Sequence, residues 1–170
     1  MFYRREISLF RTIAAHGRGE VKTKLFSSPV LRIVSGDKTL EIVFKKKAGR
    51  THTVMSCAFP ELREYAINLI SQDYGLIKIE VGYGVQDILF NDKNFDRRYI
   101  VQGNQEGFVR NLLVPDIRQQ LVDINNLHPR IILKDGEFTV AVPQVLHDEP
   151  RLARFLATGL SMVTRLKELK

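Results

Sequence analysis

The chain has 170 residues, 44% of them hydrophobic and 26% charged, a composition that is typical of a globular domain and excludes a wholly disordered chain. The single cysteine, Cys57, excludes an internal disulfide, and the longest uncharged stretch, 155–164, is about half of the ~20 apolar residues that span a bilayer. Basic residues number 26 against 19 acidic ones, and residues 1–60 alone carry twelve basic and four acidic side chains. The net charge of +7 therefore comes from the first third of the chain, which indicates either basic strands and turns that keep a small domain soluble or an anionic partner, such as nucleic-acid phosphates or lipid headgroups.

Hydrophobic spacing predicts the elements of the N-terminal half. Apolar residues recur at helical spacing over Tyr3–His16, and two glycines then end the predicted helix. Alternation with a period of two follows, which is typical of strands with one packed face and one solvated face. The turn sequences Ser35–Lys38 and Lys47–Arg50 predict two hairpins. These turns join three predicted strands, over 30–34, 39–44 and 51–59.

The middle of the chain is harder to assign. Residues 60–70 fit one helix face and also one strand face, and we expect a strand. The β-branched run 76–81 predicts a further strand, followed by a loop at Gly82-Tyr83-Gly84. Another strand is predicted over 95–101, with Tyr99 and Val101 packed inward and Arg98 facing solvent.

The C-terminal part predicts helices on either side of a hairpin. A short helix over 106–114 precedes a second one that begins at Pro115 and ends near Ile124. Asp135-Gly136 is a strong signal for a two-residue hairpin turn between strands 130–134 and 137–142. Asp148 is expected to cap a long final helix, on which Gly159 would allow a close approach to a sheet. The apolar stripe of this helix consists of Leu152, Phe155, Leu156, Leu160, Val163 and Leu166.

These elements predict an α+β fold in a single domain over residues 1–170. We expect an antiparallel β-meander with an N-terminal helix, two central helices and a long C-terminal helix packed on the sheet. A basic, strand-rich part would occupy residues 1–84, and a strand-helix-helix-hairpin-helix part would occupy 85–170.

Motifs for enzyme or cofactor chemistry are missing from the sequence. The four histidines are far apart, and no zinc motif, phosphate-binding loop or dinucleotide fingerprint occurs, so we expect no metal and no cofactor. Cys57 and His52 are an odd number of residues apart on one predicted strand, so their side chains would point to opposite faces, and Cys57 is expected to be an inert buried thiol. Asp87, Asp92 and Asp96 are the remaining catalytic alternative, but their neighbours indicate turn and cap residues.

Clustered lysines give the best candidate site, because adjacent strands would bring their ammonium groups close together. The candidate anion-binding residues are Lys22, Lys24, Lys45, Lys46, Lys47 and Arg50. The sequence has no tryptophan, and aromatic residues are not interleaved with these cations as in a base-stacking surface. We therefore expect a non-enzymatic interaction or structural module that docks on an anionic protein or membrane surface. Nonspecific nucleic-acid binding through the basic N-terminal third is the alternative.

The start of the chain bears on where the protein acts. Charges at positions 4–6 stand where a secretory signal would need apolar residues, so we expect a cytoplasmic protein, with peripheral attachment to a membrane as the alternative.

The second half of the chain, about residues 85–170, resembles a family of uncharacterised bacterial proteins of the DUF3137 type. The resemblance consists of a Phe-Asp-x-x-Tyr-x-Val segment, a Leu-Leu helix end, a second helix with Arg and Leu, a glycine-containing hairpin and a closing helix. The matching residues are Phe95, Asp96, Tyr99, Val101, Leu112, Leu113 and Arg118. The resemblance implies that these residues are structural, and it brings no catalytic residues. Members of the family often follow N-terminal membrane helices, and this sequence shows none.

Overall fold

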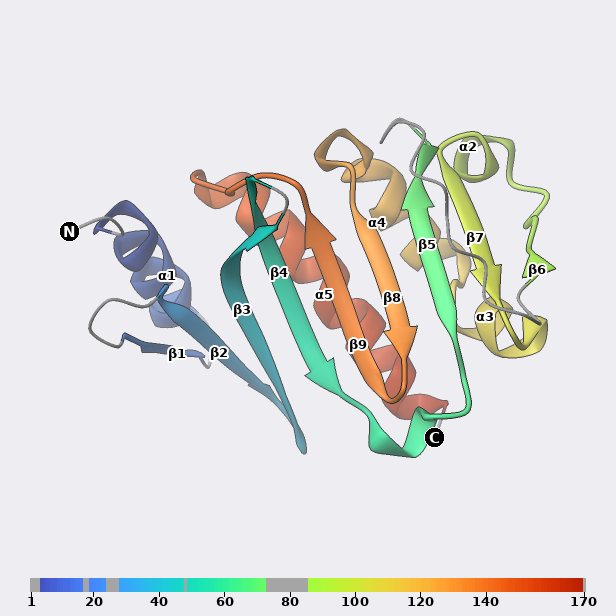
Figure 1. The fold of residues 1–170 in the computed structure, drawn as a ribbon, viewed down its shortest axis with the longest axis horizontal. Coiled ribbons are helices and arrows are strands. Elements are labelled where there is room, and N and C mark those ends of the chain that lie inside the picture. Colours follow the sequence, from blue (N-terminus) through green and yellow to red (C-terminus); the bar gives the residue numbers. More distant parts are fainter. Residues whose placement is uncertain (1–3, 17–18, 24–27, 48, 73–85, 170) are drawn as a thin grey trace.

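The computed structural model describes residues 4–16, 19–23, 28–47, 49–72 and 86–169, and these form one layer of antiparallel strands with helices packed against it (Figure 1). The described strands build an antiparallel sheet in the order β1-β2-β3-β4-β9-β8-β5-β7-β6. The strands are β1 (Gly19–Lys22), β2 (Val30–Ser35), β3 (Lys38–Lys47), β4 (Arg50–Ala58), β5 (Ile67–Ser71), β6 (Gln86–Asp87), β7 (Tyr99–Gly103), β8 (Arg130–Lys134) and β9 (Glu137–Val142). The helices are α1 (Arg4–His16), α2 (Lys93–Asp96), α3 (Glu106–Leu112), α4 (Pro115–Asp123) and α5 (Glu149–Glu168), with 3₁₀ turns η1 (Pro60–Leu62) and η3 (Asn125–Leu127).

The described helices lie on the same side of the sheet (Figure 1). Helix α1 covers the β1–β3 end, where Phe10 stacks on Phe44 with ring centroids 5.0 Å apart. Helix α5 crosses behind β4, β9 and β8, and α3 and α4 cover the β8–β5–β7 region. Burying apolar surface in this layer supplies the main driving force for folding. The predicted α+β class, with its N-terminal helix, central helices and long C-terminal helix packed on the sheet, is confirmed.

The hairpins follow from local turn chemistry. Asp135 and Gly136 both have positive φ, 52° and 76°, as a type I′ turn requires, and β8 pairs with β9 directly around them. The β2–β3 and β3–β4 hairpins also form at their predicted turns. Strands β8 and β9, late in the sequence, lie between β4 and β5, so both predicted parts of the chain contribute to the same sheet.

Helix α5 is built as its sequence predicts. The Asp148 side chain accepts a hydrogen bond from the Arg151 backbone N–H at 2.9 Å, which caps the helix N-terminus. A Cβ atom added at Gly159 would overlap the Met55 side chain of β4, with Met55 Sδ only 2.7 Å away. Glycine therefore lets the helix backbone approach the sheet closely, as expected from the sequence.

Two segments differ from their prediction. The strand expected over 60–70 is confined to β5, because Pro60 begins a 3₁₀ turn and the strand starts only at Ile67. The strand expected over 95–101 starts at Tyr99, because Asp92 caps a helical turn by accepting a hydrogen bond from the Phe95 N–H. Short polar side chains can outcompete strand pairing in this way. The strand and loop predicted over 76–84 lie outside the described residues.

Candidate anion-binding surface

The two faces of the sheet differ in what covers them. Leu40, Ile42 and Phe44 of β3 point into the helix layer and are buried. The alternating residues point to the other side, which we call the open face, because no described helix lies on it (Figure 1). The strand register aligns small apolar residues across this face in one row, from β2 to β9. This apolar row consists of Val30, Val43, Val54 and Ala141.

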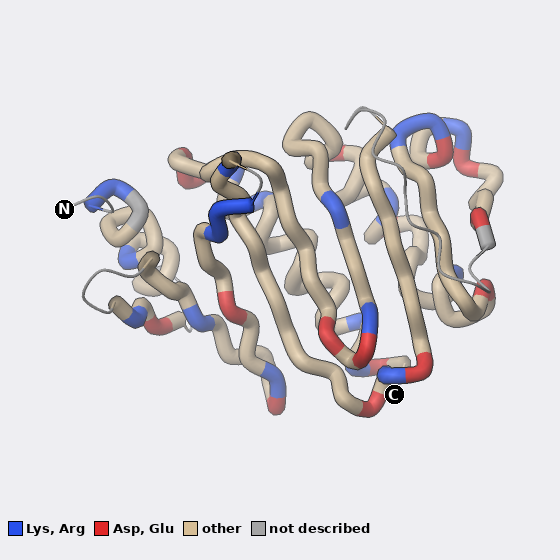
Figure 2. The backbone as a smooth tube through the Cα atoms, viewed as in Figure 1, with Lys and Arg blue, Asp and Glu red and all other residues tan. Residues whose placement is uncertain are grey.

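Cations gather at one end of the open face, at the tip of the β3–β4 hairpin (Figure 2). Lys45 and Lys47 alternate with Val43 along β3, and Arg50 is the register partner of Lys47. We call Lys45, Lys47 and Arg50 the cationic end. All three side chains are exposed, and within the described part of the chain none of them pairs with a carboxylate. Their mutual repulsion is thus left uncompensated, and an anion would relieve it.

The other predicted cations are placed differently. Lys46 is at the same hairpin tip, but the alternation directs its side chain to the opposite face of the sheet. Lys22 of β1 shares the open face but pairs with Glu20 at 3.2 Å. Lys24 lies outside the described residues. The structure thus brings Lys45, Lys47 and Arg50 together on one face, with Lys46 beside them and Lys22 apart.

Two further cations on the open face were missed by sequence reasoning. Arg130 and Lys134 of β8 alternate with the buried residues Ile131 and Leu133, so their side chains share the face of the apolar row. Arg130 is the register partner of Ala141, which puts it at the β8 end of the row. The alternation of Arg130 with Ile131 in the sequence indicates that Arg130 lies on the solvated face of its strand. Its place beside the apolar row could not be predicted, because the position of β8 between β9 and β5 was not.

Elsewhere on the open face, two opposite charges on neighbouring strands pair with each other. Arg32 of β2 and Glu41 of β3 are register partners, and their side chains meet at 2.6 Å. Such exposed pairs contribute little to stability, and they leave no net charge for a partner. The cationic end therefore differs from the rest of the face in having charges of one sign.

The three aspartates proposed as a catalytic alternative hold turns and strand ends. Asp96 accepts hydrogen bonds from the backbone N–H groups of Phe90 and Asp92, both at 3.1 Å. Asp92 caps α2 and pairs with Arg118 at 3.1 Å, and its pKa is lowered first by the Phe95 backbone N–H and then by that guanidinium. Asp87 accepts from the Gln102 amide at 2.8 Å. Each carboxylate thus has a local structural partner.

The residues that carry the family resemblance line the core at this end of the molecule. Phe95, Tyr99, Val101, Leu112 and Leu113 are buried. The Tyr99 hydroxyl donates to the Leu121 carbonyl at 2.5 Å. The remaining motif residue, Arg118, donates to the Leu113 carbonyl at 2.8 Å and lies over the Phe90 ring, 5.1 Å from its centroid. These contacts tie α2, α4 and β7 together.

Cys57 lies on the core face of β4 and is buried, whereas His52 belongs to the open face of the same strand. Burial raises the pKa of the Cys57 thiol from 9.0 to about 11. A thiol in this state is a poor nucleophile at neutral pH, and His52 is on the wrong side to serve as its base.

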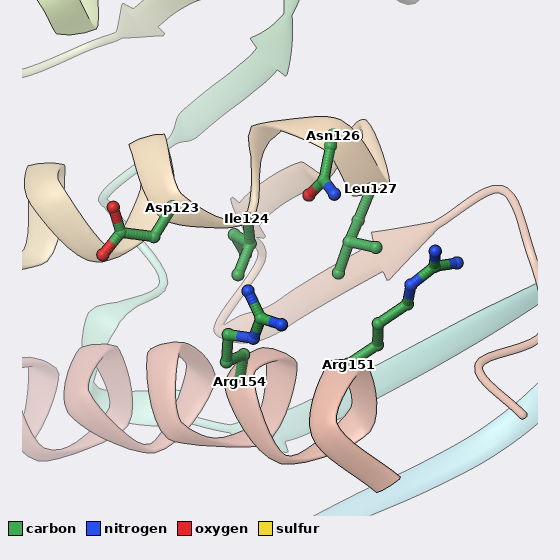
Figure 3. Close-up of a pocket in the computed structure, with 6 residues that line it drawn as sticks. All are labelled: Asp123, Ile124, Asn126, Leu127, Arg151 and Arg154. Atoms are coloured by element: carbon green, nitrogen blue, oxygen red, sulfur yellow. The ribbon is translucent and has the colours of Figure 1, made fainter. Parts of the chain in front are cut away.

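Two hollows in the described structure differ in size. The smaller one lies between η3 and α5, where the Arg154 side chain points toward Ile124 and the Arg151 side chain points away from Asp123 (Figure 3), and its volume of about 10 Å³ fits a single water molecule. The larger is a groove of about 520 Å³ where β3 and β4 diverge beyond the Glu41–Ser56 pair. This groove is lined by Thr39, Glu41, Ser56, Cys57, Ala58, Pro60, Arg63, Asp135, Gly136 and Glu137. Because it carries acids as well as a base, it does not extend the cationic end.

The described residues also bear on metal binding and on membrane crossing. Among these residues, no group of three or more His, Cys, Asp or Glu side chains is arranged to hold a metal ion. None of the helices that the structure describes is long and apolar enough to cross a membrane.

Comparison with known proteins gives the fold. No family model matches the sequence, and no curated protein matches it. Among solved structures, the chain is similar to the crystal structure of the mycobacterial trehalose monomycolate transport factor A, TtfA. The TM-score is 0.59 at 10% sequence identity, and the match covers 96% of this chain and 93% of that one. The chain thus shares the fold of TtfA over nearly its whole length.

Proposed function

We propose that this protein is a non-enzymatic interaction module that docks on an anionic protein or membrane surface through the open face of its sheet. The observation that carries the proposal is the cationic end, where Lys45, Lys47 and Arg50 lie together without a carboxylate partner in the described part of the chain. We also propose that the protein is cytoplasmic, and that it attaches to the periphery of a membrane if its partner is lipid.

Electrostatics supports an anionic partner. Lys45, Lys47 and Arg50 extend from two paired strands, so their charges lie within about one Debye length of each other at physiological salt, about 8 Å. A phosphate or carboxylate group placed between them interacts with several cations at once. The strand register fixes the backbone positions from which the three side chains extend, so their cationic groups remain near each other.

The likeness to TtfA supports the architecture only, because the two sequences share 10% identity. The proposal therefore rests on the surface of this chain. Nonspecific nucleic-acid binding would use the same cations, and it is one outcome of the experiment below.

Charge reversal tests the proposal. The variant carries Lys45→Glu, Lys47→Glu and Arg50→Glu. A matched control carries Arg11→Glu, Lys93→Glu and Arg154→Glu, which are exposed helical residues with the same total change of charge. Binding is measured to polyglutamate, to phosphatidylserine-containing vesicles and to duplex DNA. We expect the unaltered protein to bind polyglutamate or the anionic vesicles, the hairpin variant to lose this binding, and the control to keep most of it.

Two results would reject the proposal. Equal losses in both variants would show that net charge alone attracts the probes. Preferential binding to DNA, with a log-log salt slope near −0.9 per phosphate contact, would favour the nucleic-acid alternative instead.

A further inference from the structure

We infer that the partner of the open face is an acidic amphipathic helix of another protein, seated along the apolar row with its acidic flank toward the cationic end. The inference rests on the proposed function, and it names the class of partner.

The charge of the open face selects an anionic occupant. The opposite charges of Arg32 and Glu41, which form an ion pair on strands β2 and β3, neutralise each other. On strands β2, β3, β4, β9 and β8, the remaining charged side chains on this face are Lys45, Lys47, Arg50, Arg130 and Lys134, opposed by Glu137. A second copy of this chain would bring two such faces together and repel, so the charges argue against a symmetric dimer through this face.

The shape of the apolar row selects a protein over a bilayer. Val54 is only 7% exposed, and Val30, Val43 and Ala141 are half-buried between their neighbours, so the row is flush with the sheet. Insertion into the membrane interface needs protruding large side chains. Among the described residues, Val34 and Leu89 are the exposed large hydrophobic residues, at 55% and 66%, and only Val34 belongs to this face. A partner helix could bring its own large side chains to a flat surface, which a lipid headgroup cannot.

The geometry of the row suits a helix. From Val30 on β2 to Arg130 on β8 the row crosses four strand spacings, or about 19 Å at about 4.8 Å each. A helix of about 13 residues covers this length, with apolar contacts at i, i+3, i+4 and i+7. Lys45, Lys47 and Arg50 lie along one side of it, and Arg130 lies at one end.

Strand addition is the competing way to bind a peptide. The described edge strands are β1 and β6, with four and two residues, and such short edges offer few backbone hydrogen bonds. The broad open face is therefore the better docking surface in the described part of the chain.

The experiment uses the full chain and four probes. The first is a synthetic peptide with leucine at helical spacing and glutamate on its polar face. The second is its composition-matched scramble, the third replaces glutamate by lysine, and the fourth is a phosphatidylserine-containing vesicle. We expect the acidic amphipathic peptide to bind at least about tenfold more tightly than the scramble, and the lysine peptide not to bind.

Variants locate the contact. Val43→Glu places a charge in the middle of the row, and we expect it to weaken binding of the acidic peptide at least about tenfold. Val54→Thr preserves the shape of the side chain and keeps the test valid should Val43→Glu fail to fold, with an expected loss of about threefold. Unfolding midpoints of both variants serve as the control for structure.

The outcomes separate this inference from the proposed function. Equal affinity for the acidic peptide and its scramble would overturn the helix while leaving anionic docking intact. Vesicle binding that resists Val43→Glu and displaces the peptide would assign the face to a membrane, which also overturns it. If the chain binds neither polyglutamate nor anionic vesicles, the proposed function itself fails.

Discussion

The two faces of strand β9 differ in how deeply their side chains are buried. Phe138, Val140 and Val142 point into the helix layer and are fully buried, whereas Thr139 and Ala141 point to the open face and are half-buried. Both sets depend on the same strand pairing with β4 and β8. Neighbouring residues of one strand therefore belong to different faces, so a substitution can change the packed core without changing the open face, and the reverse.

The largest expected effect comes from breaking the core face. Phe138→Ala removes a buried aromatic ring and leaves a cavity, so we expect a loss of about 3–5 kcal/mol in the free energy of unfolding. Thr139→Ala, the next residue along β9, should cost less than about 1 kcal/mol. Urea denaturation of both variants measures the difference.

Binding of polyglutamate gives a second measurement on the Thr139→Ala variant. Thr139→Ala should leave the affinity for polyglutamate unchanged, since it removes no charge. Similar stability losses in the two variants would contradict the division of the sheet into a packed face and an open face.

The local parts of this fold were predictable from sequence. The turn at Asp135-Gly136, the Asp148 cap and the glycine contact at Gly159 each depend on a few neighbouring residues or on one steric requirement. The strand order was not predictable, because the insertion of β8 and β9 between β4 and β5 depends on pairing across most of the chain. The short helix α2 was missed for another reason, since Asp92 and Asp96 hold its turn by side-chain hydrogen bonds that hydrophobic periodicity does not register.

In the candidate site, too, the local features were predictable from the sequence and those that depend on strand order were not. Lys45, Lys47 and Arg50 share a face because a two-residue turn fixes their register, and that turn is readable in the sequence. Arg130 joins their face only through the strand order, so sequence reasoning could not include it. Lys22 was grouped with the hairpin lysines by composition, but its pairing with Glu20 satisfies its charge locally.

A smaller effect is expected at the contact between α5 and the sheet. Gly159→Ala introduces a methyl group against Met55, and overpacking of this kind costs about 1–3 kcal/mol, so after the ~1 kcal/mol that alanine gains in helix propensity we expect a net loss of up to about 2 kcal/mol. Gly107→Ala in α3 is the matched control, because a Cβ atom there meets nothing within 4 Å. Thermal or urea unfolding should show a loss for the first variant and no loss for the second.

Met55 provides the second half of that test. In a Met55→Ala background the space for the new methyl group is already open, so Gly159→Ala should cost less than it does in the unaltered protein. Additive losses would mean that the helix backbone does not depend on this contact.

The smallest expected effect is on the open face, at the ion pair between Arg32 and Glu41. The two side chains meet at 2.6 Å across β2 and β3, but both are partly exposed, so water and salt screen their attraction. A double-mutant cycle with Arg32→Gln and Glu41→Gln should give a coupling of about 0.2–1 kcal/mol at low salt, decreasing in high salt. Measuring the cycle by urea denaturation at two salt concentrations checks both points. A coupling that is large and independent of salt would mean that the pair is shielded from water, and the open face would then be covered in the folded protein.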